Sequence, residues 1–176
     1  DEIYDEFIFP PHSHTSPSSY SEDVLIIRGY SKTYGCTGWR LGYAAGPSRI
    51  IDEMSKLQQQ TFVCAPSAFQ KAIVDAHEID LSPMLTRFAT RRDMVVEALG
   101  DVTELTVPDG SFFAFPKVPT HLGMTGSDFI AKAIEQNVLV IQGNIFSEKD
   151  THFRISFATA DERLEKGLSI LRSLLS

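Results

Sequence analysis

The chain has 176 residues, of which 43% are hydrophobic and 22% are charged, proportions that are ordinary for a globular protein with one or two modest cores. A formal net charge of -7 argues against a surface for nucleic acid or for an anionic membrane, because phosphate groups attract basic patches. No apolar run reaches the length of a membrane span. With no signal peptide before Cys36 and Cys64, we expect free thiols and a cytoplasmic location.

The first 21 residues predict little regular structure. The sequence Asp1 to Tyr4 is interpreted as following a strand end, and because no initiator methionine precedes it, we expect a fragment of a longer protein. Phe7 to Ser21 is rich in proline and serine, which is typical of an irregular connection. His12 and His14 have no companion cluster of Cys, Asp or Glu with metal-ligand spacing. We therefore predict a solvated loop and no metal site.

Lys32 is the residue at which the sequence first predicts chemistry. The run from Val24 to Ile27 predicts a fully buried strand that ends shortly before Ser31-Lys32, and open α/β sheets bind ligands at strand ends. A lysine in a partly apolar cleft near another cation loses proton affinity, and its neutral amine forms a Schiff base with a carbonyl. Arg40 offers a planar donor fork for a phosphate. Although each residue alone is more often a solvated charge, together they suit a phosphorylated aldehyde such as pyridoxal 5'-phosphate (PLP).

The segment from Leu41 to Leu99 predicts one strand followed by three helices. Leu41 to Ala45 is the strand, and Pro47 then opens a helix whose apolar residues recur at helical spacing. Ser67 to Gln70 fits a capping box at the start of a second helix. Ser82-Pro83 begins a long amphipathic helix that Gly100 ends, and we interpret it as a connector between two sheet regions.

After Val102 the pattern changes to short strands and two helices, which favours an antiparallel α+β region. The predicted strands are 104–107, 111–116, 138–141 and 152–158, and the predicted helices are 127–136 and a closing helix with a capping box at 159–162. Arg154 lies in the last strand between apolar neighbours. From its position alone, an internal salt bridge with a carboxylate is the favoured interpretation.

The residues around Lys32 form a recognisable motif. They read S-K-x-x-G-x-x-G-x-R-x-G-Y, at Ser31, Lys32, Gly35, Gly38, Arg40, Gly42 and Tyr43. This motif resembles the lysine motif of fold-type I, class I/II PLP-dependent aminotransferases of the aspartate aminotransferase type. The resemblance covers nearly the whole chain, but only the C-terminal half of a typical member.

The resemblance implies an α/β fold in two parts. Residues 1–85 would be the C-terminal part of the large PLP-binding domain, which has a mixed sheet with helices and carries Lys32. Residues 86–176 would be the connecting helix and a small α+β C-terminal domain with an antiparallel sheet. It further implies an enzyme that transfers an amino group between an L-amino acid and a 2-oxo acid, as a homodimer in the full-length parent.

The same resemblance assigns roles to individual residues. Lys32 would be catalytic, first as the Schiff base and then as the proton shuttle, while Ser31, Lys32 and Arg40 would bind the cofactor. Asp1 would bind the pyridine nitrogen and Tyr4 the phenolic oxygen. Arg154, in the sequence R-I-S-F, would hold the substrate α-carboxylate instead of forming a salt bridge. Gly29 departs from the pattern, because many members have a phosphate-binding serine there.

Two alternatives remain open. Another fold-type I PLP enzyme, a lyase or a decarboxylase, would share Lys32 and Arg40. A non-catalytic, aminotransferase-like ligand-sensing domain would share the fold without turnover. Because family residues that precede Asp1 and residues of a partner subunit also contribute to the site, we expect the isolated fragment to bind PLP weakly and to be poorly active.

Overall fold

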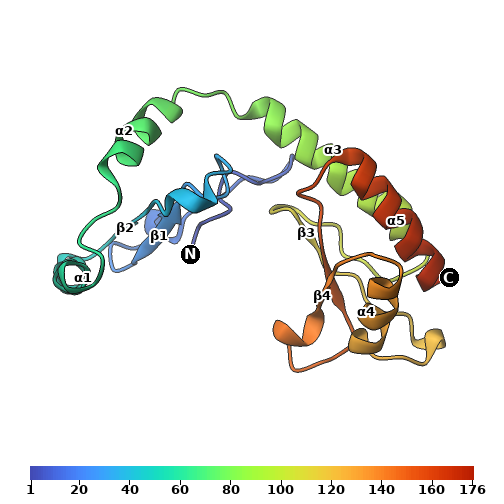
Figure 1. Cartoon of the computed structure of the whole chain (residues 1–176). Coiled ribbons are helices and arrows are strands. Elements are labelled where there is room, and N and C mark those ends of the chain that lie inside the picture. Colours follow the sequence, from blue (N-terminus) through green and yellow to red (C-terminus); the bar gives the residue numbers. More distant parts are fainter. The chain divides into compact units, whose positions relative to one another are not determined.

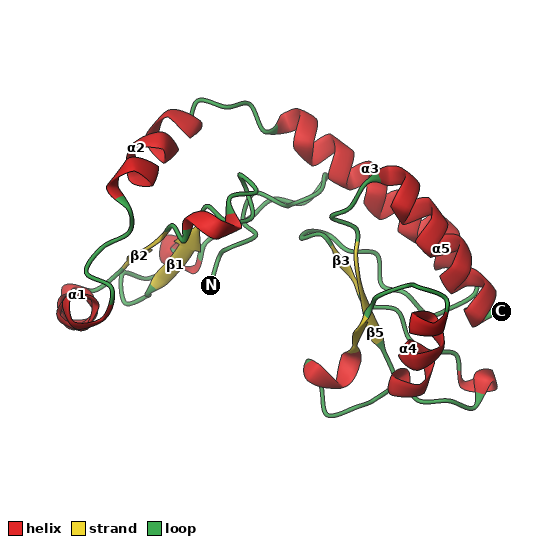
Figure 2. Ribbon diagram, viewed as in Figure 1, coloured by secondary structure: helices red, strands yellow, loops and turns green.

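The computed structural model describes residues 1–176, which form two compact units, Asp1–Leu81 and Ser82–Ser176 (Figure 1). Both units contain helices and short strands, as the α/β interpretation predicts (Figure 2). The division into a large-domain part and a small domain at residue 85 stays a prediction. None of the helices is both long and apolar enough to cross a lipid bilayer.

The first unit is built on a two-stranded antiparallel ladder. Strand β1 (Ile26–Gly29) pairs with β2 (Gly42–Ala45), and Gly29 lies opposite Gly42. Two helices follow, α1 (Ser48–Thr61) and α2 (Ser67–Ala76). The predicted strand at 41–45 and the predicted opening of a helix at Pro47 are confirmed.

Two expectations for the first unit are wrong. The strand predicted at Val24–Ile27 is displaced towards Gly29 and is not fully buried, since the Ile27 side chain is 47% exposed. Its only strand partner in this chain is β2, so much of its surface is uncovered. The capping box predicted at Ser67 does not form, because Pro66 is the N-cap residue and Gln70 instead donates to the Ala65 carbonyl at 2.7 Å.

The second unit packs helices against a three-stranded antiparallel sheet. The sheet has the order β3 (Phe113–Ala114), β5 (Phe153–Ser156), β4 (Ile141–Gln142), which confirms the antiparallel prediction. The helices are α3 (Ser82–Leu99), α4 (Gly126–Glu135) and α5 (Asp161–Leu175), and α3 lies along α5 (Figure 1). One face of the sheet and the apolar sides of these helices form the core.

Several details of the second unit differ from the expectations. Residues 104–107 form no strand, and of the strand predicted at 138–141 only Ile141 belongs to β4. Thr159 does not cap α5, because Ala160 is the N-cap residue. Asp161, in the first turn of α5, accepts from Arg91 Nε at 2.6 Å. The capping box of this unit lies at α4, where the Thr125 amide donates to the Asp128 carboxylate and the Asp128 amide donates to the Thr125 hydroxyl, both at 3.1 Å.

Candidate active site

Lys32 lies in a loop whose base is closed by the β1–β2 ladder. Beyond the pair Gly29–Gly42, the Tyr30 amide donates to the Leu41 carbonyl at 3.3 Å, so the loop spans residues 30–41. Lys32 is half-buried in a turn, and the Gly35 amide donates to its carbonyl at 3.3 Å. Its amine has no ion-pair partner in the chain. No carboxylate of the chain therefore neutralises the charge of this amine.

Arg40 lies at the other end of the same loop, in an uncommon backbone conformation. Its φ and ψ are 54° and 44°, the left-handed region, which long side chains rarely adopt. Its Nη1 donates to the Thr37 carbonyl at 2.8 Å, and the side chain is otherwise exposed. A non-glycine residue in this region is strained, and such strain occurs preferentially at functional sites.

The segment Asp1–Tyr4 lies beside β1. The Glu2 amide donates to the Ile27 carbonyl at 2.8 Å, which adds the segment to the edge of the strand. A Cβ atom at Gly29 would lie only 2.6 Å from Ile3 Cδ1, so the Ile3 side chain already fills the space next to Gly29. The serine that many family members have at this position would not fit without moving Ile3.

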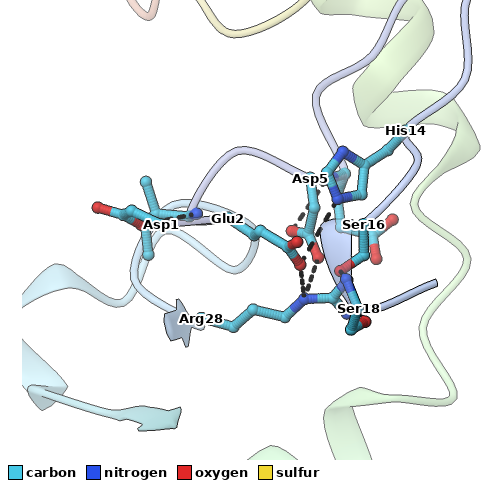
Figure 3. A network of polar contacts seen from close by, with 9 residues as sticks. Asp1, Glu2, Asp5, His14, Ser16, Ser18 and Arg28 are labelled. Atoms are coloured by element: carbon cyan, nitrogen blue, oxygen red, sulfur yellow. Dashed lines mark hydrogen bonds and ion pairs between the residues drawn. The ribbon is translucent and has the colours of Figure 1, made fainter. Parts of the chain in front are cut away.

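A buried polar network holds this segment against β1 (Figure 3). Glu2 accepts from Arg28 Nε at 2.7 Å, Arg28 also pairs with Asp5 at 3.2 Å, and His14 Nε2 lies 3.5 Å from the Glu2 carboxylate. The Glu2 side chain is only 8% exposed. A hydrogen bond from Ser16, together with the Arg28 guanidinium, outweighs burial and lowers the pKa of Glu2 from 4.5 to about 2.

Aromatic side chains surround the loop that carries Lys32. The Tyr30 ring lies 5.7 Å from the Tyr43 ring and 5.7 Å from the His77 ring, and Tyr34 lies 6.4 Å from His77, measured between centroids. Burial raises the pKa of Tyr30 and of Tyr34 above the ordinary tyrosine value. The loop that carries Lys32 is therefore lined by phenol rings and an imidazole ring.

In the second unit, Arg154 projects from the face of β5 opposite to the core. Its neighbours Phe153 and Ile155 are buried, whereas Arg154 is half-buried. The salt bridge that the sequence position of Arg154 favours does not form. No carboxylate of the chain pairs with this guanidinium. Its guanidinium instead lies over the rings of Phe113 and Phe146.

The structure thus places the predicted residues in two groups. Asp1, Tyr4, Ser31, Lys32 and Arg40 all belong to the first unit, around β1 and its loop, and Arg154 belongs to the second unit. Sequence reasoning missed the Glu2–Arg28 pair and the rings around Arg154. Glu2 and Arg28 are 26 positions apart, so no local pattern signals their contact.

Comparisons with known proteins define the class. Residues 1–171 match the family Aminotransferase class I and II, so the chain belongs to this family. It is 34% identical to a probable aspartate aminotransferase of Methanocaldococcus jannaschii, over 99% of this chain and 48% of the relative. It is 33% identical to an aspartate aminotransferase of Pyrococcus abyssi, again over 99% of this chain and 48% of the relative.

Solved structures give the same result. The aromatic aminotransferase from Pyrococcus horikoshii OT3 superposes with a TM-score of 0.93 at 32% identity, covering 99% of this chain and 50% of that one. The aspartate aminotransferase from Thermotoga maritima gives a TM-score of 0.90 at 32% identity, with 99% and 46% covered. The chain spans about half the length of the curated relatives it matches.

Members of this family depend on PLP, and the side chains of the first unit fit that cofactor. Lys32 supplies a half-buried amine without an ion-pair partner, and Arg40 has guanidinium donors beyond the one that bonds Thr37. Asp1 and Tyr4 add a carboxylate and a phenol on the segment beside β1. An amine for an aldehyde, a guanidinium for a phosphate and a carboxylate for a ring nitrogen match the functional groups of the cofactor.

Proposed function

We propose that the complete gene product containing this chain is a PLP-dependent aminotransferase that moves an amino group between an L-amino acid and a 2-oxo acid. The observation that carries the proposal is Lys32, a half-buried amine without an ion-pair partner in a loop closed by Tyr30 and Leu41. The names of the similar proteins, aspartate and aromatic aminotransferases, support this reaction class.

Each predicted site residue of the first unit has a proposed role. Lys32 binds the cofactor and then moves the proton at the substrate Cα atom, acting as general base and acid. Ser31 and Arg40 bind the phosphate, Asp1 holds a proton on the ring nitrogen, and Tyr4 donates to the ring oxygen. When bound, PLP supplies the aldehyde and the electron-withdrawing ring.

Arg154 is proposed to bind the α-carboxylate of both the amino acid and the 2-oxo acid. A guanidinium presents two parallel N–H donors in the geometry that a carboxylate accepts. Because no carboxylate of the chain pairs with Arg154, these donors are available to a ligand. The cationic group would fix which end of the substrate reacts, since only one end carries this carboxylate.

We further propose a cytoplasmic location and a homodimer for the complete protein. Both cysteines, Cys36 and Cys64, are free, which suits a reducing compartment. Phe62 and Val63 at the end of α1 are 65% and 66% exposed, and exposed apolar groups of this size are typical of surfaces that bind another subunit. Sedimentation of the complete protein would test the dimer.

Replacement of Lys32 tests the function most directly. In the complete gene product, we expect Lys32→Ala to reduce kcat by at least about 10⁴-fold, because both the covalent bond and the proton transfer are lost. Lys32→Arg is the matched control, since it keeps the charge but not the nucleophile. Without cofactor, the free energy of unfolding should stay within about 0.5 kcal/mol of wild type, because the Lys32 amine forms no ion pair that the substitution would remove.

Product analysis separates the alternatives. Formation of the 2-oxo acid from the donor, with equal formation of the new amino acid, supports transamination. Release of CO₂ or of an unsaturated product would assign a decarboxylase or a lyase instead. Binding of an amino acid without any turnover, unchanged by Lys32→Ala, would assign a ligand-sensing protein and would rule out the proposal.

A further inference from the structure

Two phenylalanine rings lie against the guanidinium of Arg154. Its Cζ atom lies 4.2 Å from the centroid of the Phe113 ring and 4.3 Å from the centroid of the Phe146 ring. Both distances are well within the 6 Å or so at which a cation and an aromatic ring attract each other. The two rings come from different elements, Phe113 from β3 and Phe146 from the end of the 3-10 helix η4 (Gly143–Ile145).

The sheet register explains the position of the first ring. Phe113 pairs with Ser156 in the antiparallel ladder, and side chains two residues apart on a strand share a face, so Phe113 and Arg154 lie on the same face. Phe112 and Ala114 point to the core on the opposite face, with exposed fractions of 9% and 1%. The core thus fixes β3, and β3 fixes the Phe113 ring.

The backbone at Gly143 explains the position of the second ring. The Gly143 amide donates to the His152 carbonyl at 2.8 Å, and a Cβ atom at Gly143 would lie 2.4 Å from that oxygen. This close approach, available to glycine, brings η4 against the start of β5. The Phe146 ring also meets the Phe115 ring edge-on at 6.2 Å, and Phe115 stacks on His152 at 5.2 Å.

The contact of the Arg154 guanidinium with the two rings has a consequence for carboxylate binding. An ion pair would hold Arg154 in place but would consume its N–H donors, whereas stacked rings hold the plane of the guanidinium and leave the N–H groups at its edge unused. Two acidic groups of the second unit pair with other cations, Asp161 with Arg87 and Arg91, and Glu104 with Lys117. Arg154 is thereby held in place and still unpaired.

We propose that Phe113 and Phe146 are positioning residues that orient Arg154 for an incoming carboxylate. They fix the guanidinium plane before the ligand arrives, which lowers the entropy cost of forming the two parallel hydrogen bonds. This inference rests on the proposed function, in which the ligand is the substrate α-carboxylate. Because this group is common to the amino acid and to the 2-oxo acid, the rings affect both substrates equally.

Kinetics of the complete gene product provide the first test. We expect Phe146→Leu to raise KM for the amino acid and for the 2-oxo acid by the same factor, roughly tenfold, with a smaller change in kcat. Phe146→Tyr keeps the ring and should restore wild-type KM. Phe115→Leu is the control within the cluster and should have a smaller effect, because Phe115 contacts Phe146 and not Arg154.

A second readout is independent of catalysis. In the complete protein without cofactor, labelled with ¹⁵N-arginine, the ring currents of Phe113 and Phe146 should shift the Arg154 side-chain protons upfield. Titration with propionate should move the Arg154 Nε–H signal and saturate at lower concentration in wild type and Phe146→Tyr than in Phe146→Leu. Phe146 is half exposed, so its replacement should leave the fold intact.

The outcomes distinguish a failure of the proposed function from a failure of the proposed positioning role of Phe113 and Phe146. If the wild-type protein shows no transamination, the proposed function fails, and the propionate titration still decides the role of the rings. If Phe146→Leu loses the upfield shift but binds propionate and both substrates like wild type, the rings only pack and the inference is overturned. Equal losses in Phe146→Leu and Phe146→Tyr would overturn it as well.

Discussion

The two units of the chain bury very different amounts of apolar surface. The first unit has four buried apolar side chains, Phe7, Phe9, Leu41 and Ile73, whereas the second has fifteen. In place of a large core, the first unit has the Glu2–Arg28 network and the short β1–β2 ladder. The unit that carries Lys32 therefore depends on polar contacts, and the unit that carries Arg154 depends on its core.

This difference separates two ways of holding a reactive residue. Lys32 and Arg40 lie in one loop, so their position follows from the closure of that loop and from the segment that Glu2 anchors. Arg154 projects from a strand whose other face is packed, which is the more rigid arrangement. Local opening should thus be easier in the first unit than in the second.

The largest expected effect is on the core of the second unit. Phe153 is fully buried on β5, and Phe153→Ala should reduce the free energy of unfolding of this unit by about 3–5 kcal/mol, because it leaves a cavity. Tyr20 of the first unit is 83% exposed, so Tyr20→Ala should cost less than about 0.5 kcal/mol. Amide hydrogen exchange, measured unit by unit, checks both values. Equal effects would show that the two units do not differ as described.

An intermediate effect is expected from acid. The folded-state pKa of Glu2, about 2, lies below its ordinary value of 4.5, so its ionised form stabilises the first unit above pH 4.5. This stability is lost as pH falls from 4.5 towards 2, because the unfolded chain then binds a proton more tightly than the folded one. Urea unfolding at several pH values, followed on amides of β1 and β2, measures the slope. Glu2→Gln should lower the plateau and flatten the slope, and an unchanged slope would contradict the assignment.

The smallest expected effect concerns the backbone at Arg40. Because its φ is 54°, glycine should suit this position better than alanine, and Arg40→Gly should be more stable than Arg40→Ala by about 1 kcal/mol. Both variants should lose affinity for inorganic phosphate or for PLP to the same extent. A comparison of urea midpoints gives the stability difference, and no difference would mean that the loop relaxes around residue 40.

Much of the fold followed from sequence pattern, and the exceptions share a cause. The helices beginning near Pro47, Ser67 and Ser82 and the strands near Gly42 and Phe153 were predictable from periodicity and from helix-start signals. The capping boxes predicted at Ser67 and Thr159 are wrong for the same reason, because each helix begins one residue away from the predicted position, with Pro66 and Ala160 as the N-cap residues. In the first turn of α5, Asp161 pairs with Arg91 from α3, a contact across 70 positions.

For the candidate site, the sequence alone determined the residue types and the spacing of the lysine motif, because Lys32 and Arg40 lie eight positions apart in one loop. Only the tertiary structure decided what surrounds each group. Arg154 lies against the rings of Phe113 and Phe146 and forms no salt bridge, and Glu2 accepts a hydrogen bond from Arg28. Both contacts depend on strand register and loop packing, which bring together residues that no local pattern connects.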